Sequence, residues 1–347
     1  MYYVLYNRQF KSIGDSLVLE HWSRVQRSYD YDEMSIRGEM IPYAEDPFFV
    51  VVNDRQGRQI FSGLSSVPTT SEKEQKTTMS LKDYKTLWNT EIVVPWASFI
   101  SFTYVWEYID KILSLWLAQT DVGFSGISWD TTEITGISLS EGMSTEEDAT
   151  TSVESVYDLI NGACLLTDIW CEPYLDIKHK QLVFKFRKPP INSVSVRLAD
   201  LGVSELEKSF GDVNRASVYT SDFSLLETWA LTENNAVARL PAIAPLVYPA
   251  KHKVFVASDA TDQALQDAIY NAVTALAESR YQERVTIDVN AHSSVVDLSL
   301  VDLSYSVQVY TEKGFYRTLP VGEVQTSSAG EKVIILGKQY QELTQEI

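Results

Sequence analysis

The sequence has 347 residues, 45% hydrophobic and 22% charged, a composition typical of a globular protein with two or more domains. Its 47 acidic side chains against 29 basic ones give a formal charge of -18, which disfavours a protein that grips nucleic acid because such a surface repels phosphate. It has no run of about 18 apolar residues and no charged leader before an apolar segment, so we expect no membrane insertion, no signal peptide and folding in a cytoplasm.

The first hundred residues are predicted to be mainly β. Residues 48–64 indicate a β-hairpin, because five apolar residues are followed by turn chemistry at 53–57 and a second strand-like run. Residues 68–78, PTTSEKEQKTT, are polar and without periodicity, so we expect an exposed loop there. We assign residues 1–100 to a first small antiparallel β-barrel domain.

Residues 80–96, SLKDYKTLWNTEIVVPW, place the carboxylates of Asp83 and Glu91 near two tryptophans. Two carboxylates can form a glycosidase acid/base pair, but sequence separation does not establish the distance that the pair requires. In context we interpret Asp83 as a helix start or a surface charge, followed by a strand over 92–96 that Pro95 places at a sheet edge. The packing face of the short helix would be Leu81, Tyr84, Leu87 and Trp88.

Residues 101–190 are predicted to form an α+β insertion domain. Apolar residues recur at helical spacing over 105–116, which indicates an amphipathic helix. A loop rich in glycine, serine and acidic residues is expected over 121–150. A T-x-x-E capping box made by Thr151 and Glu154 then predicts the start of a second helix. Two strands follow that helix, at 169–177 and 182–186.

The remaining residues predict further strands and one long helix. Short strand-like runs in residues 191–250 are expected to complete the first barrel. Asp259 is the expected cap of a helix that runs to about Tyr281. A strand and a three-stranded antiparallel meander follow, so residues 251–347 are assigned to a long helix plus a second β-barrel domain. The expected fold class is therefore α+β, mainly β, with two small antiparallel β-barrel domains and α/β insertions.

Motifs for chemistry are missing from the sequence. It contains no phosphate-binding glycine loop, nucleophile elbow or zinc-protease motif. Asp30, Asp32 and Glu33 lack the glycine and glutamate that a calcium loop requires, which favours a solvated turn. Cys164 and Cys171 have no partners at metal-ligand spacing, so we expect two buried free thiols. We therefore predict no catalytic, cofactor-binding or metal-binding residue and no enzyme activity.

Aromatic residues make up 12% of the chain. In strands such residues most often serve in the core or in cross-strand pairs; protein interfaces rank second and sugar platforms third. The third use motivates an alternative function, a carbohydrate-binding or carbohydrate-active tail or cell-surface protein that uses the aromatics around Trp88 and Trp96. Whether Trp96 faces the core or a neighbouring subunit is left open by the sequence.

Five segments, distributed over nearly the whole chain, are similar to one known family. They are FFVVVNDRQGRQIFSGLSS (48–66), LKDYKTLW (81–88), SVYDLINGACLLTDIWCEPYLDIKHKQLVFKF (155–186), VDLSYSVQVYTEKG (301–314) and VIILGKQYQEL (333–343). Together they resemble the baseplate hub proteins of tailed bacteriophages, a group that includes the N-terminal hub domain of siphophage tail-associated lysins. Each segment contributes hydrophobic patterns and turns, and the order of the segments adds to the resemblance.

The resemblance implies a non-enzymatic homotrimer at the virion tail tip, assembled in the cytoplasm of the host bacterium. Two barrels per subunit would form a ring of six similar domains that adapts the sixfold tail to the tip and surrounds a DNA channel. The implied partners are a distal tail ring protein, the tape-measure protein and fibre or spike proteins. DNA would pass without specific binding, which offers a use for the acidic charge. In departure from the lysin version, we expect no following hydrolase domain and therefore expect cell-wall cleavage to belong to another protein.

Overall fold

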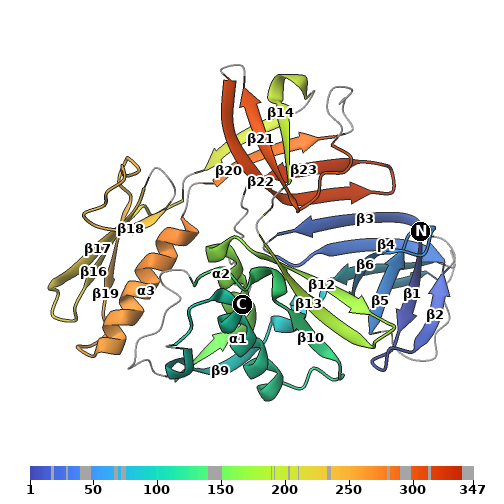
Figure 1. Cartoon of the computed structure of the whole chain (residues 1–347), viewed down its shortest axis with the longest axis horizontal. Helices are drawn as coiled ribbons and strands as arrows, with labels where there is room; N and C mark the ends of the chain where they lie inside the picture. The colour runs from blue at the N-terminus through green and yellow to red at the C-terminus, as the bar shows by residue number, and fades with distance from the viewer. Residues whose placement is uncertain are drawn as a thin grey trace.

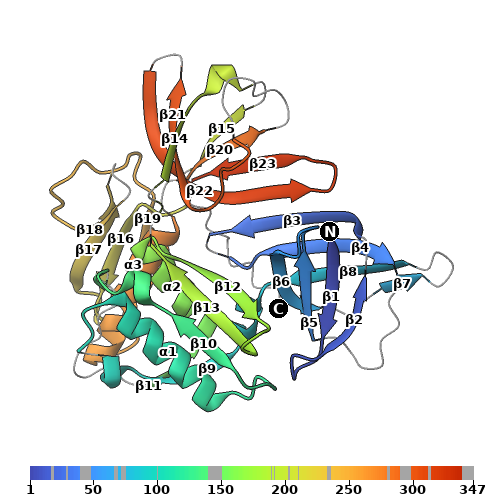
Figure 2. The ribbon, with the colours of Figure 1, turned by 45° about the vertical axis from the view of Figure 1, so that its right-hand side comes forward.

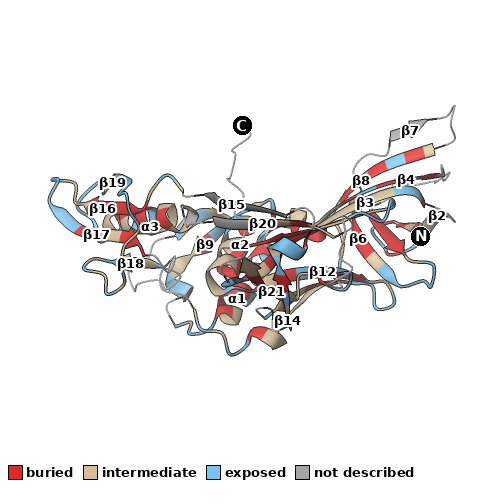
Figure 3. Cartoon of the chain, turned by 90° about the horizontal axis from the view of Figure 1, so that it is seen from above, coloured by how far each residue is buried: buried red, intermediate tan, exposed pale blue. Residues whose placement is uncertain are grey.

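The computed structural model places the strands and helices around four hydrophobic cores (Figure 1). Seen from above, the units lie side by side, with the N-terminal strands at one end and α3 with its sheet at the other (Figure 3). The described residues are 1–16, 19–28, 30–39, 48–65, 69–71, 76–99, 101–139, 151–188, 190, 192–201, 204–209, 211–232, 236–279, 282–289, 298–311 and 314–337. None of the helices in these residues is both long and apolar enough to cross a membrane.

The N-terminal β-unit contains β1 (Tyr2–Tyr6), β2 (Ser12–Ser16), β3 (Leu19–Arg27), β4 (Glu33–Glu39), β5 (Phe49–Asn53), β6 (Gln59–Ser65), β7 (Thr69–Ser71) and β8 (Lys76–Lys82). The expected hairpin is confirmed as β5–β6. All five residues of β5 are buried because alternate side chains enter different cores: Val50 and Val52 pack in the N-terminal core, and Phe49 and Val51 in the central one.

The expectation of an exposed loop over 68–78 is wrong for the residues that the structure describes. Thr69–Ser71 forms β7, which pairs with the start of β8, and Thr77 is buried in that strand. Threonine is β-branched and fits a pleated sheet, so a polar sequence can still form a strand. Residues 68 and 72–75 lie outside the described residues.

The C-terminal β-unit has its own core. It contains β14 (Asn192–Arg197), β15 (Ser204–Ser209), β20 (Gln282–Asp288), β21 (Tyr305–Thr311), β22 (Gly314–Ser327) and β23 (Lys332–Leu336), with the short helix η4 (Leu198–Asp200) after β14. The predicted meander is confirmed, since β21 pairs with β22 and β22 with β23, each antiparallel. β14 joins in parallel to β21, and β15 joins antiparallel to β20.

β22 connects the two β-units (Figure 2). Its first half pairs with β21, while its second half lies between β23 and β3, with Glu323 opposite Arg27. A 14-stranded sheet results, with the main order β15-β20-β23-β22-β3-β4-β8-β6-β5-β1-β2. The mainly β, α+β class is confirmed, but no closed barrel is found among the described strands, whose order ends openly at β15 and β2.

The central unit packs helices and short sheets around the largest core. Its elements are η1 (Tyr84–Trp88), β9 (Glu91–Pro95), η2 (Trp96–Phe99), α1 (Val105–Gln119), β10 (Ile127–Asp130), η3 (Thr132–Ile134), β11 (Thr151–Ser155), α2 (Val156–Thr167), β12 (Trp170–Asp176) and β13 (Gln181–Arg187). Both predicted helices and both predicted strands are confirmed. Within the segment 121–150, β10 and η3 replace part of the expected loop, and residues 140–150 lie outside the described residues.

The capping box predicted at Thr151 is wrong. Residues 151–155 form β11, which pairs antiparallel with β9, and α2 begins after Ser155, whose hydroxyl accepts a hydrogen bond from the backbone N–H of Asp158 at 3.3 Å. The tertiary pairing with β9 overrides the local capping signal. β9 also agrees with the strand predicted over 92–96, and β11 is its sole partner among the described strands, which places Pro95 in an edge strand.

The fourth unit consists of a small sheet covered by α3. Its elements are β16 (Arg215–Tyr219), β17 (Leu225–Leu231), β18 (Val237–Arg239), β19 (His252–Val256) and α3 (Asp262–Glu278). α3 confirms the predicted long helix, but its N-cap is Thr261 rather than Asp259, whose carboxylate instead accepts from the backbone N–H of Thr261 at 2.8 Å. The described strands of residues 191–250 pair with C-terminal strands or with one another, and not with those of residues 1–100.

Candidate functional site: a charged junction between the units

Asp83 lies at the start of η1, as expected, but in the interior rather than at the surface. It is 3% exposed, and its carboxylate accepts from the backbone N–H of Lys85 and of Asp32, each at 2.9 Å. Glu91 is an exposed residue at the start of β9. Because Asp83 is closed off from solvent, these two carboxylates do not form an open glycosidase pair.

Lys85 forms a buried ion pair with Asp83. Its ammonium nitrogen lies 3.2 Å from Oδ2 of Asp83 and donates to the backbone carbonyl of Asp30. Burial raises the pKa of Asp83 to about 7, and the charge of Lys85 opposes that rise. Burial acts to lower the pKa of Lys85, but the carboxylates of Asp83 and Asp32 outweigh it and raise that pKa. The pKa of each group therefore depends on the charge of the other.

Asp30 links this pair to α2. It is 6% exposed, and its Oδ1 accepts from the hydroxyl of Tyr157 in α2 at 2.6 Å. Asp32 accepts from the backbone N–H of Arg27 at 2.9 Å and thereby fixes the β3–β4 turn. The expectation of a solvated turn is wrong for Asp30, because α2 covers it. Among the described residues no group of acidic, histidine or cysteine side chains could hold a metal ion.

Arg27 connects the turn to the C-terminal β-unit. Its Nε donates to Oε2 of Glu323 at 3.2 Å, and the Glu323 side chain is 8% exposed. Burial acts to lower the pKa of Arg27, but the nearby carboxylates, Glu323 first and then Glu33, outweigh it and raise that pKa above its ordinary value. We call this set the charged junction; it consists of Arg27, Asp30, Asp32, Asp83, Lys85, Tyr157 and Glu323.

The charged junction links three units of the chain: β3 and the turn after it in the N-terminal unit, η1 and α2 in the central unit, and β22 in the C-terminal unit. Its charged groups form hydrogen bonds and ion pairs with one another inside the chain. The arrangement therefore suits the positioning of the units relative to one another rather than chemistry on a substrate. Buried ion pairs contribute little net stability compared with apolar packing, but removing one partner is costly. The junction therefore favours one relative placement of the units. A signal in the sequence was available for Glu323, a lone charge within the apolar strand VGEV.

The two tryptophans that the sequence suggested for sugar binding pack in or against the central core. Trp88 is 2% exposed, and its ring lies 4.6 Å from that of Phe184. Trp96 is partly buried against the same core and donates from Nε1 to the hydroxyl of Ser152 at 2.7 Å, so within the chain its ring faces the core. Cys164 and Cys171 are buried free thiols, as predicted.

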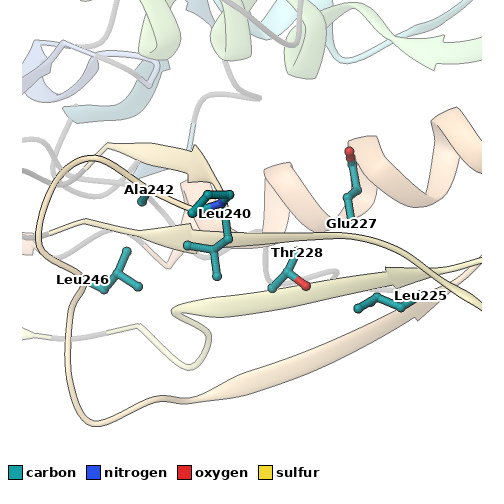
Figure 4. Close-up of a pocket in the computed structure, with 7 residues that line it drawn as sticks. Leu225, Glu227, Thr228, Leu240, Ala242 and Leu246 are labelled. Atoms are coloured by element: carbon teal, nitrogen blue, oxygen red, sulfur yellow. The ribbon is translucent and has the colours of Figure 1, made fainter.

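An exposed apolar face lies on the fourth unit, on the side of the sheet away from α3. Leu225 and Val256 both align with Tyr219 in the strand registers, so they share this face, and they are 58% and 42% exposed. A shallow cavity of about 610 Å³ adjoins it, lined by residues of β17 and of the loop after β18 (Figure 4). Surfaces of this kind mark protein contacts more often than single exposed apolar residues do.

Comparison with known proteins shows similarity in structure but not in sequence. No family model and no curated protein matches the sequence. The prophage tail protein gp18 from Listeria monocytogenes EGD-e superposes with a TM-score of 0.52 at 10% identity, covering 99% of this chain and 95% of that chain. The chain has the fold of prophage tail proteins. This confirms, at the level of fold, the resemblance seen in the sequence.

Two further structures agree with this result. The 43 kDa tail protein of prophage MuSo2 from Shewanella oneidensis has a TM-score of 0.51 at 11% identity and covers 97% of this chain and 98% of that chain. The tail protein from Neisseria meningitidis MC58 has a TM-score of 0.50 at 12% identity and covers 97% of both chains. The near-complete coverage in both directions means that all four units, and their order, take part in the similarity.

Proposed function

We propose that the chain is a structural baseplate hub protein of a phage or prophage tail tip and that it has no enzymatic role. The observation that carries this proposal is the fold shared over nearly the full length with tail proteins. The charged junction supports it, because its buried groups hold units together rather than face a cavity. Trp88, around which the sequence suggested a sugar-binding surface, is buried, and this removes the main support for the carbohydrate-active alternative.

In this proposal three copies form a ring around the DNA exit channel. The N-terminal and C-terminal β-units, each with its own core, are the two barrel-like domains of a subunit, and the central unit, which includes residues 101–190, is the insertion between them. Six similar units per ring then match a sixfold tail. The charge of -18 suits a channel wall, because a wall that bound phosphate would slow the passage of DNA.

The partners in this proposal are a distal tail ring protein, the tape-measure protein and fibre or spike proteins, at the tail tip of a virion assembled in the host cytoplasm. The exposed apolar face of the fourth unit is a suitable contact for such a protein, since its Leu225 and Val256 remain accessible in the single chain.

Native mass spectrometry of the purified chain, alone and with the distal ring protein of the same phage, tests the proposal. We expect a trimer in at least the second sample. A chain that stays monomeric in both samples at high concentration contradicts the trimeric hub. Deletion of the gene gives an independent check: induced lysates should lack complete tails, and the wild-type chain supplied in trans should restore them.

A further inference from the structure

A groove of about 530 Å³ is lined by residues of the N-terminal sheet and of β12. The ribbon shows β12 ending beside the N-terminal sheet (Figure 1; Figure 2). Successive side chains of a strand alternate between its faces, so Tyr2 and Tyr6 of β1 lie on the same face of the sheet. Asn53 of β5 is opposite Tyr2 in the register and lines the same groove. Tyr174 and Asp176 of β12 line the other side.

Asn53 supplies a polar group to this groove. The residue is 9% exposed, no hydrogen bond of its side chain is found within the described residues, and its amide is not among the fully enclosed polar atoms, so the amide meets solvent in the groove. Its donor and acceptor atoms are therefore available to a group that displaces water from them. An amide that is unpaired within the chain and open to a groove is suited to bind a ligand that enters the groove.

The other lining residues define what that ligand is. Three tyrosines supply ring faces and hydroxyls, and apolar surface comes from Val4, Val51, Leu175 and Ile177. Gln59 adds a second amide, whose Nε2 donates to the hydroxyl of Ser62 at 3.0 Å and whose oxygen faces no recorded partner in the described residues. None of the lining residues is positively charged, which disfavours a phosphate or another anion. Asp176 accepts from the backbone N–H of His179 at 3.0 Å and contacts its ring Nδ1 at 2.7 Å, so each of its carboxylate oxygens already has one partner.

We propose that this groove binds a neutral saccharide. The C–H faces of the sugar rings would stack on Tyr2, Tyr6 and Tyr174, and the amide of Asn53 would bond ring hydroxyls. Aromatic rings beside a few fixed polar groups are the usual composition of such a pocket, and the volume lies in the range of about 300–1,000 Å³ that ligand sites occupy. The proposal moves the sugar-binding surface away from Trp88 and Trp96. It goes beyond the hub function, since it gives the chain a contact with glycans as well as with tail proteins.

A glycan array of neutral bacterial surface oligosaccharides, probed with the full chain, tests this proposal. Dissociation constants for the best array oligosaccharide are then measured by calorimetry for Asn53→Ala and Tyr174→Ala, with Tyr104→Ala as the control. Tyr104 and Tyr174 are each 39% exposed, but Tyr104 lies outside the groove. We expect both groove variants to bind at least about tenfold more weakly and the control to bind like the wild type.

A stability measurement separates binding from folding. Because Asn53 has no internal hydrogen-bond partner, Asn53→Ala should keep the wild-type melting temperature while it loses binding. A marked fall in melting temperature would show that the amide serves the fold and would overturn the assignment. The proposal is also overturned if no neutral oligosaccharide on the array binds, if both groove variants bind like the wild type, or if a peptide occupies the groove and is not displaced by sugar. None of these outcomes bears on the trimer, which is tested separately.

Discussion

Replacement of Lys85 by methionine tests whether the charged junction holds the units as described. Lys85 and Asp83 side chains are 6% and 4% exposed, and their charged atoms are 3.2 Å apart. Methionine keeps most of the side-chain volume, so little packing is lost. The variant leaves the Asp83 carboxylate buried without its cation, a change that costs about 3–5 kcal/mol in comparable pairs. We therefore expect Lys85→Met to lower the free energy of unfolding by about that amount at pH 8.

The pH dependence sharpens this prediction. The folded-state pKa of Asp83, about 7, lies above its unfolded value of 3.8. The stability that the proton on Asp83 provides is fully present below pH 3.8 and is lost as the pH rises through 7. In Lys85→Met the ionised carboxylate has lost its partner, which raises its pKa further. The variant should therefore lose much more stability at pH 8 than at pH 5, where Asp83 takes up a proton.

Urea unfolding followed by tryptophan fluorescence measures both quantities, because the buried Trp88 and Trp116 report on the central core beside the junction. The double variant Asp83→Asn with Lys85→Met is the control, since it leaves no buried charge from this pair and should recover at least half of the loss. A loss below about 1 kcal/mol at pH 8, or equal losses at pH 5 and pH 8, would refute the reasoning.

Four further substitutions test other contacts. Gly63→Ala should destabilise the protein by about 1–3 kcal/mol in urea unfolding, because the added Cβ would lie 2.3 Å from a backbone oxygen of β8. Gly162→Ala in α2 should stabilise it by about 0.5–1 kcal/mol, because the added Cβ meets nothing within 4 Å. Equal effects of the two substitutions would contradict this packing. Gln119→Ala should lower the free energy of unfolding by about 1 kcal/mol and speed hydrogen exchange in β9, because the Gln119 side-chain amide bonds both the N–H and the C=O of Val93 at 2.8 Å. Unchanged exchange in β9 would contradict the proposed role of Gln119 in holding this strand. Glu323→Ala should increase proteolytic cleavage between the two β-units, and cleavage at the wild-type rate would contradict the junction.

Sequence patterns predicted those features that depend mainly on residues close together in the chain. The apolar stripe from Val105 to Trp116 led to α1, because helical periodicity needs no distant partner. The hairpin β5–β6 followed from its turn, where Gly57 has a φ of 81° that suits glycine. The thiols of Cys164 and Cys171 were predicted to be free and buried from the absence of partners in the sequence, and the structure confirms this.

Long-range pairing explains what the sequence did not predict. β3 and β22 become neighbours through the register that sets Arg27 against Glu323, residues separated by 296 positions. Asp30 looked like a turn residue and is buried by Tyr157, 127 positions away. At Thr151 a capping signal competed with strand pairing to β9, and the pairing won. The same kind of contact joined the two β-units into one sheet rather than separating them as independent barrels.

The groove was also outside the reach of sequence reasoning. Tyr2, Asn53 and Tyr174 come from three strands in two units, and no local pattern relates them. Alternation along β1 could have predicted that Tyr2 and Tyr6 share a face, but not that β12 would lie against it. The tryptophans around 88–96 attracted the sugar-binding hypothesis because they are dense in sequence, whereas the structure uses them in packing.

Electron cryomicroscopy of tails from the phage that carries this gene tests the hub proposal most directly. The account predicts three copies of this chain around the tail axis at the tip, with the N-terminal and C-terminal β-units alternating in the ring and the fourth unit on its outside. A complete tail tip whose density accommodates no copy of this fold, or copies placed away from the axis, would contradict it.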